Sequence, residues 1–108
     1  MTLEEFKTLL EGIDGYATKV VYWAWSEGNA PALPFICYVE TGTDNFAADG
    51  IVYHSKHQVT IELYTEDKTP AEEAKVETAL TNAGIYWSKE CEYLDDEKCW
   101  LTIYSVEV

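Results

Sequence analysis

Between Val59 and Leu63, apolar residues alternate with polar ones at every second position. In an extended chain this spacing sends Val59, Ile61 and Leu63 to one side and their polar neighbours to the other. A strand with one apolar face has to bury that face against another layer of structure. We therefore predict a strand over residues 51–66 that needs a covering layer, with its more polar first part, residues 52–58, projecting from the sheet.

Two segments carry the start signals of helices that can supply this layer. Thr2 and Glu5 have the spacing of a capping box, and Gly12 and Gly15 bracket the expected end of this first helix. Its apolar stripe consists of Leu3, Phe6, Leu9, Leu10 and Ile13. The spacing of that stripe predicts a helix that packs on the sheet along one side.

The second predicted helix begins at Thr69, with Pro70 at its first position, and Gly84 closes it. Its expected apolar face consists of Val76, Ala79, Leu80 and Ala83. The charged residues of this helix are predicted to be solvated; they are Glu72, Glu73, Lys75 and Glu77.

The remaining strand patterns complete the predicted fold. Residues 20–25 are apolar or aromatic on both faces, which indicates a central strand covered on both sides. A further strand is expected over 35–40, and residues 85–108 read as a hairpin with an acidic turn at 94–98. The predicted class is a single α+β domain over residues 1–108, a mostly antiparallel sheet with two helices in the order α-β-β-β-α-β-β.

The strands offer more apolar surface than two short helices are expected to cover. This predicted surplus consists of Val20, Tyr22, Trp100, Tyr104, Val106 and Val108. An uncovered apolar area of that kind marks a contact between subunits, so we expect the chain to form oligomers.

The charge of the chain limits its partners. Seven lysines and arginines against 20 acidic residues give a formal net charge of -13, which disfavours nucleic-acid backbones and anionic membrane surfaces. Neither a signal peptide nor a membrane span is apparent, and the odd set of Cys37, Cys91 and Cys99 is expected to stay reduced in the cytoplasm.

Nothing in the residue pattern predicts catalysis, a cofactor or a metal site. His54 and His57 lie three apart in a predicted strand, where their side chains point to opposite faces and do not share an ion. A hairpin allows Cys91 and Cys99 to face each other, but their spacing fits neither a zinc nor a redox motif. We expect buried or surface roles for these side chains instead.

The candidate functional residues are therefore contact residues. The polar stretch 41–50, with its glycines and turn-forming residues, is expected to be a loop that meets a partner. Together with the two histidines and two strand aromatics, it supplies the predicted interface, namely Asp44, Asn45, Phe46, His54, His57, Trp100 and Tyr104.

Four blocks of this sequence resemble one protein family. They are TLEEF at 2–6, APALPFICYVETGTDNFAADG at 30–50, QVTIELYTEDKTPAEEAKVETAL at 58–80 and YSVEV at 104–108. Together they are similar to the small tail-completion (tail terminator) proteins of long-tailed phages and prophages of Gram-positive bacteria. The resemblance spans essentially the whole chain, and its motifs are structural rather than chemical.

The resemblance implies a virion structural protein without catalytic residues. Such proteins form a ring, commonly hexameric, that caps the tail tube and presents the surface that joins the filled head. The implied partners are other copies, the tail tube protein and the head-connector protein, with no direct contact to nucleic acid or membrane. The implied location is the host cytoplasm during assembly and then the virion, and some members are monomeric until they reach the tube.

Two other functions compete with this expectation. The net charge of -13 also suits an acidic DNA mimic that inhibits a nucleic-acid enzyme, which requires carboxylates at phosphate-like spacing along one surface. A small enzyme or ligand-binding domain requires a deep cavity with convergent polar groups, and the sequence signals none.

Overall fold

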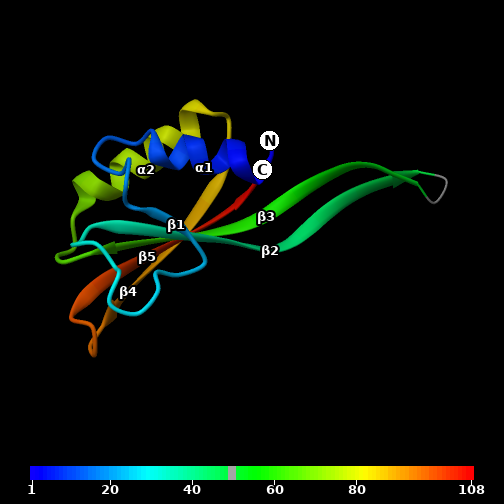
Figure 1. Ribbon diagram of the computed structural model, residues 1–108. Helices are drawn as coiled ribbons and strands as arrows, with labels where there is room; N and C mark the ends of the chain where they lie inside the picture. Colours follow the sequence, from blue (N-terminus) through cyan, green and yellow to red (C-terminus); the bar gives the residue numbers. More distant parts are fainter. Residues whose placement is uncertain (49–50) are drawn as a thin grey trace.

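A five-stranded sheet forms the centre of the molecule, and two helices lie on one of its faces (Figure 1). The computed structural model describes the backbone of residues 1–48 and 51–108 and the side chains of residues 1–45 and 56–108. The predicted α+β class and the order α-β-β-β-α-β-β are confirmed. The elements are α1 (Leu3–Glu11), β1 (Val20–Tyr22), β2 (Phe35–Ala48), β3 (Ile51–Thr65), α2 (Pro70–Asn82), β4 (Trp87–Leu94) and β5 (Cys99–Glu107).

The sheet has the strand order β1-β2-β3-β5-β4. β1 runs parallel to β2, and the other neighbouring pairs are antiparallel. The prediction of a central strand over residues 20–25 is wrong, because β1 is a three-residue strand at one edge. Trp23 ends it, since a backbone φ of +72° takes this residue out of the extended conformation.

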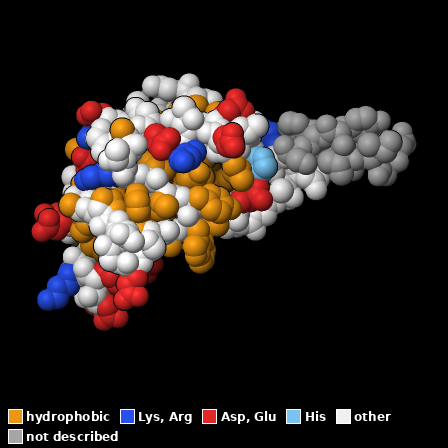
Figure 2. Space-filling view, in the orientation of Figure 1, with side chains coloured by type: hydrophobic (Ala, Val, Ile, Leu, Met, Phe, Trp, Pro, Cys, Tyr) orange, Lys and Arg blue, Asp and Glu red, His pale blue; other side chains and the backbone are white. Residues whose placement is uncertain are grey.

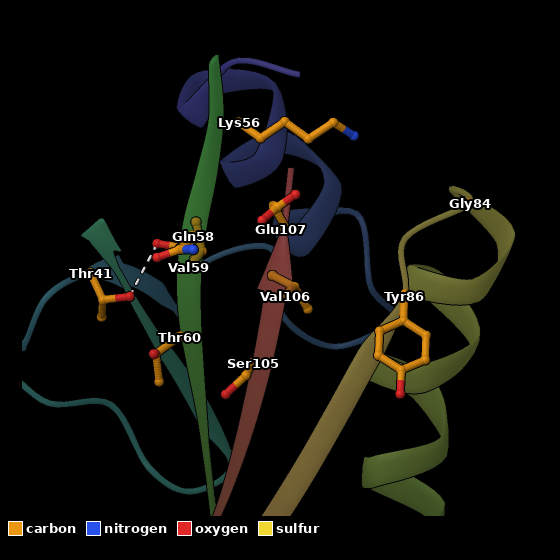
Figure 3. Close-up of a pocket in the computed structure, with 10 residues that line it drawn as sticks. All are labelled: Thr41, Lys56, Gln58, Val59, Thr60, Gly84, Tyr86, Ser105, Val106 and Glu107. Carbon is orange, nitrogen blue, oxygen red and sulfur yellow. Dashed lines mark hydrogen bonds between the residues drawn. The ribbon is translucent and has the colours of Figure 1, made fainter. Parts of the chain in front are cut away.

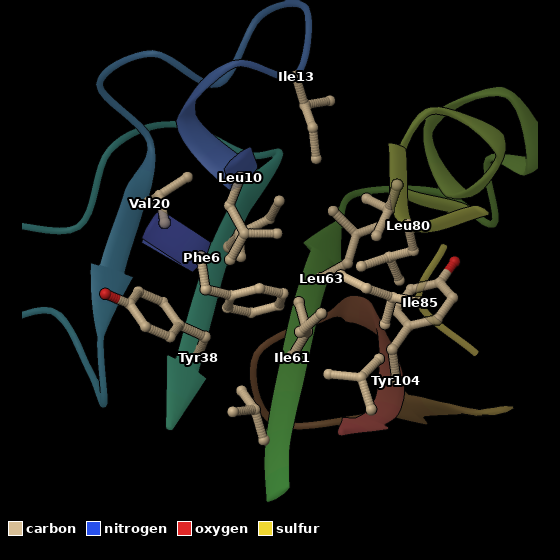
Figure 4. Packing of buried hydrophobic residues seen from close by; sticks show 14 of the residues in the cluster. Phe6, Leu10, Ile13, Val20, Tyr38, Ile61, Leu63, Leu80, Ile85 and Tyr104 are labelled. Atoms are coloured by element: carbon tan, nitrogen blue, oxygen red, sulfur yellow. The ribbon is translucent and has the colours of Figure 1, made fainter. Parts of the chain in front are cut away.

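The hydrophobic core lies between the helices and the sheet (Figure 4). Its fully buried members include Phe6 and Leu10 from α1, Leu80 from α2, and Ile61 from the central strand β3. Each helix therefore contributes one apolar stripe to a single layer of contacts, as the spacing predicts.

Most of the predicted surplus of apolar strand surface is covered within one chain. Val20, Tyr104, Val106 and Val108 are each no more than 7% exposed, so the prediction that they remain uncovered is wrong. All four belong to the hydrophobic cluster beneath α1 and α2. The two short helices therefore cover more of the sheet than their lengths suggest. Of the six residues, only Tyr22 is exposed, and Trp100 is half-buried.

The first helix begins with the predicted capping box. The Glu5 backbone N–H donates to Thr2 Oγ1 at 3.0 Å, and the Thr2 backbone N–H donates to Glu5 Oε1 at 2.9 Å. The helix ends at Gly12 in a right-handed conformation, while Gly15 takes the positive φ of +90° in the turn that follows. Neither helix in the described part of the chain is long and apolar enough to cross a membrane.

Replacing Thr2 with alanine is expected to lower the free energy of unfolding by about 1 kcal/mol, because the first turn of α1 loses its side-chain acceptor. Urea denaturation followed by circular dichroism measures this change. Thr69→Ala is the matched control, since Thr69 makes no side-chain capping bond to α2 and donates to the Asp67 carbonyl instead. Equal losses from the two substitutions would contradict the capping role of Thr2.

β2 and β3 continue beyond the body of the sheet as a two-stranded arm (Figure 1). β5 pairs with β3 over residues 58–65, and Val108 exchanges two backbone hydrogen bonds with His57, so of the described strand residues 44–48 and 51–56 pair only with each other. The predicted projection of the polar part of β3 is confirmed. The predicted loop over 41–50 is wrong for residues 41–48, because β2 continues to Ala48 with a register shift between Glu40 and Gly42. Residues 49–50 lie outside the described residues.

Candidate interaction surfaces

The exposed edge of β1 carries two large aromatic side chains. Tyr22 is 47% exposed and Trp23 is 68% exposed. Tyr22 packs edge-on against Tyr38 at 5.1 Å between ring centroids, and its hydroxyl accepts the Glu40 backbone N–H at 3.2 Å. Figure 2 shows hydrophobic side chains gathered on this side of the body, over β1 and the segment after it. We call Tyr22 and Trp23 the β1-edge patch.

The backbone holds Trp23 in place. Its N–H donates to the Tyr38 carbonyl at 2.7 Å, so the residue is tied to β2 although it has left the strand conformation. A positive φ is unusual for a bulky residue and costs on the order of 1–3 kcal/mol. The chain thus presents an exposed indole on a backbone that is bonded to β2.

A second surface lies on the face of the sheet away from the helices. It is an open groove of about 610 Å³ at the base of the arm, where Tyr86 lies on one side and Thr41 on the other (Figure 3). Thr60 of β3 and Ser105 of β5 form its floor as register partners. Tyr86 is 86% exposed. We call this the Tyr86 groove.

The groove is nearly neutral and rich in hydroxyl groups. Its charged lining residues are Lys56 and Glu107, one of each sign. Small hydroxyl side chains on its floor leave room for a side chain from another molecule, and an open polar floor next to an exposed ring is typical of a contact surface. Thr41 Oγ1 donates to the Gln58 carbonyl at 3.3 Å and ties the two strands together there (Figure 3).

The predicted interface residues lie in different parts of the structure. Asp44 and Asn45 are exposed on the arm. Phe46 and His54 lie outside the residues whose side chains are described. His57 lies at the base of the arm, where its Nδ1 pairs with the Glu40 carboxylate.

The two predicted strand aromatics do not behave alike. Trp100 is half-buried and packs edge-on against Tyr93 at 5.5 Å between ring centroids. Tyr104 is fully buried beneath α2, and its hydroxyl donates to Glu77 Oε2 at 2.7 Å. The prediction that Tyr104 is a contact residue is therefore wrong, because its side chain has no exposed surface in the folded chain.

A buried carboxylate joins α2 to its surroundings. Glu73 was predicted to be solvated, but it is 3% exposed. Lys68 donates to its Oε2, and Lys89 of β4 donates to its Oε1 at 3.0 Å. Burial alone would raise the pKa of Glu73, but the two lysine hydrogen bonds outweigh burial and hold that pKa below its ordinary value.

Acidic residues gather at the end of the β4–β5 hairpin (Figure 2), where the turn also contains Lys98. Glu90 and Glu92 are exposed on β4, and Asp95, Asp96 and Glu97 follow in the turn. Their charges have no ion-pair partner among the described residues. This end of the molecule therefore repels anions and attracts cations.

The three cysteines are reduced and differ in exposure. Cys91 is exposed on β4, whereas Cys37 and Cys99 are buried. Cys91 pairs with Thr102 and Cys99 pairs with Leu94, so the two thiols of the last hairpin do not face each other. In the described part of the chain no three metal-ligating side chains converge.

Thiol labelling is expected to be fast at one cysteine and slow at two. The thiolate is the reactive form, and burial raises the pKa of Cys37 to about 11 and also raises that of Cys99. At pH 8 a disulfide reagent such as Ellman's reagent should therefore release one equivalent rapidly from the native chain. The fast equivalent should disappear in Cys91→Ser, and three equal fast equivalents would contradict the burial of the other two.

Sequence reasoning missed the two most exposed aromatic residues of the surfaces described here. The predicted covered strand over residues 20–25 includes Trp23, and no prediction concerns Tyr86. The signal for Tyr86 is its position between Gly84 and the alternating residues of β4, which sends it away from the core side occupied by Ile85 and Trp87. No comparable signal marks Trp23, because its exposure follows from a backbone conformation.

Comparison with models of known protein families gives no match to this chain, and comparison with curated proteins gives none either.

Proposed function

We propose that this chain is a structural protein of a long-tailed phage or prophage that closes the end of the tail tube as a ring of copies and presents the surface for head joining. The observation that carries the proposal is the presence of two different exposed aromatic surfaces, the β1-edge patch and the Tyr86 groove. The first lies at the β1 edge of the sheet, and the second lies over β3 and β5, between Thr41 of β2 and Tyr86 just before β4.

A ring of identical subunits needs such a pair of unlike surfaces. In a cyclic assembly each copy uses one patch to contact the next copy and a different patch to receive the previous one. The arm adds an extended element that stands clear of the body and is available to a third partner (Figure 1). The sequence resemblance to tail-completion proteins supports the same function.

The charge of the chain fits a passage for DNA. All seven basic residues are lysines, and four of them, at positions 19, 68, 75 and 89, are held by hydrogen bonds within the chain. A negative surface does not grip the phosphate backbone, which suits a ring through which DNA has to move.

Purified tail tubes provide the test. Mixed with this chain, tubes are expected to carry a ring-shaped density at one end in negative-stain electron micrographs and to stop growing when tube protein is added. Bovine serum albumin at the same concentration serves as the control for nonspecific blocking. Tubes that remain bare and keep growing would rule out the proposed function.

An acidic inhibitor of a nucleic-acid enzyme is the second candidate, supported by the unpaired carboxylates of residues 90–97. Inhibition of a nuclease that is lost in high salt and in Glu90→Gln/Glu92→Gln would favour it over the ring. Glu4→Gln is the control, because this exposed carboxylate lies in α1 and outside that cluster.

A further inference from the structure

The geometry points to a specific contact between copies, in which Trp23 of one copy docks in the Tyr86 groove of the next. This inference rests on the proposed ring function and names the residues through which the copies join. The inserted group is an exposed indole on a fixed backbone, and the receiving surface is an open groove with an exposed tyrosine at its side.

The groove has room for the indole. Its volume of about 610 Å³ lies within the range of about 300–1,000 Å³ found for sites that bind small molecules. Thr60 and Ser105 on its floor are small, and Tyr86 offers a ring face or edge to a second aromatic side chain. Tryptophan and tyrosine are also the side chains most often found at the energetic centre of protein contacts.

The charge distribution favours contact between two copies at these two surfaces rather than at other parts of the molecule. The chain carries a net charge of -13, so most pairs of surfaces on two copies repel each other. Residues 18–39, which include the β1-edge patch, contain one lysine and one glutamate, Lys19 and Glu27. The groove also has one charged residue of each sign. Its Lys56 makes no ion pair in the described part of the chain, so its ammonium group can pair with Glu27 of the incoming copy.

The size of the contact predicts weak association of the free protein. One buried aromatic side chain contributes about 150–250 Å², whereas a stable interface buries about 800 Å² on each partner. A single contact between Trp23 and the groove is therefore expected to form at high protein concentration and to be reinforced where many copies are held on one tube.

The contact is head-to-tail, which gives a complementation test. Wild type, Trp23→Ser and Tyr86→Ser are compared by sedimentation velocity over a concentration series. Wild type is expected to associate as concentration rises, and each single variant is expected to associate at least about tenfold more weakly. Because both side chains are largely exposed, both variants are expected to keep the wild-type unfolding curve.

An equimolar mixture of the two variants distinguishes a contact between the indole and the groove from a contact between two like surfaces. Trp23→Ser keeps an intact groove and Tyr86→Ser keeps an intact indole, so together they form one contact and stop at a dimer. Tyr93→Ser is the matched control, because this exposed tyrosine lies outside both surfaces and should leave association unchanged. A wild type that stays monomeric at the highest concentration, a control variant that also loses association, or a mixture that does not recover dimers would each overturn the contact.

Tube capping and self-association, measured on the same variants, separate this contact from the proposed function. Tubes that are capped by wild type and equally well by Trp23→Ser would leave the ring function standing and overturn the contact. Association that follows the pattern above, together with tubes that stay uncapped, would leave the contact standing and overturn the function.

Discussion

Replacing Phe6 with alanine is expected to lower the free energy of unfolding by about 3–5 kcal/mol. Phe6 is fully buried, packs edge-on against Tyr38 at 6.1 Å between ring centroids, and attaches α1 to the sheet (Figure 4). The substitution removes a whole ring from a close-packed interior, and the short α1 helix cannot move far enough to fill the space. A domain of this size has a total stability of about 5–15 kcal/mol, so the loss is a large fraction of it.

Urea denaturation monitored by tryptophan fluorescence and by circular dichroism measures the effect. Phe6→Leu is the matched control and is expected to lose about 1.5 kcal/mol or less, since it keeps most of the apolar volume. A loss below about 1 kcal/mol in Phe6→Ala would show that α1 is not held to the sheet through this side chain.

Replacing Glu73 with alanine is expected to cost about 2–3 kcal/mol, because two lysines lose the buried carboxylate to which they donate. Lys68 and Lys89 are 39% and 35% exposed, so water partly replaces the lost bonds and keeps the cost below that of a fully buried pair. Glu90→Ala is the control, since this exposed carboxylate has no ion pair in the described part of the chain, and it should change stability by less than about 0.5 kcal/mol.

The same carboxylate should also make the free energy of unfolding depend on pH in the acidic range. The pKa of Glu73 in the folded chain lies below its ordinary value of 4.5, so its contribution is present at neutral pH and is lost as the pH falls below that value through the folded pKa. Between pH 7 and pH 3, the free energy of unfolding of Glu73→Ala should therefore fall less steeply than that of wild type. Parallel curves would contradict a charged, bonded Glu73 in the native state.

Local patterns predicted most of the fold because they depend on near neighbours in the sequence. The alternation from Val59 to Leu63 gave β3, and the pairing of Thr2 with Glu5 gave the start of α1. In both segments the conformation that the local sequence favours is the one that the folded chain adopts. The order of elements and the class of fold followed from them.

The errors have a common cause, which is contact between residues distant in sequence. Glu73 looks solvated beside Glu72 in a first helical turn, but Lys89 from another strand reaches it and makes its burial favourable. The stretch 41–50 has the composition of a loop, yet cross-strand pairing with β3 extends β2 to Ala48. In the same way, β1 lies at the sheet edge because it pairs with β2 alone.

The candidate surfaces were harder to predict than the fold. Of the predicted uncovered aromatic residues Tyr22 is exposed and Tyr104 is buried, whereas the most exposed aromatic residues, Trp23 and Tyr86, are not among those predicted. Apolar residues on both faces of a segment do not show which face the chain covers. The positive φ that turns Trp23 outward has no signature in its neighbours, since the residue itself is neither glycine nor asparagine.

The arm also determines how the molecule carries a mechanical load. β3 runs from the arm into the middle of the sheet, with β2 on one side and β5 on the other. Ladder hydrogen bonds lie across the strands, so a pull on both strands of the arm loads in shear the ladders that join them to the rest of the sheet, β3–β5 and β1–β2, with many bonds strained together rather than broken one by one. Tension applied to the arm is thereby resisted by the whole body of the protein.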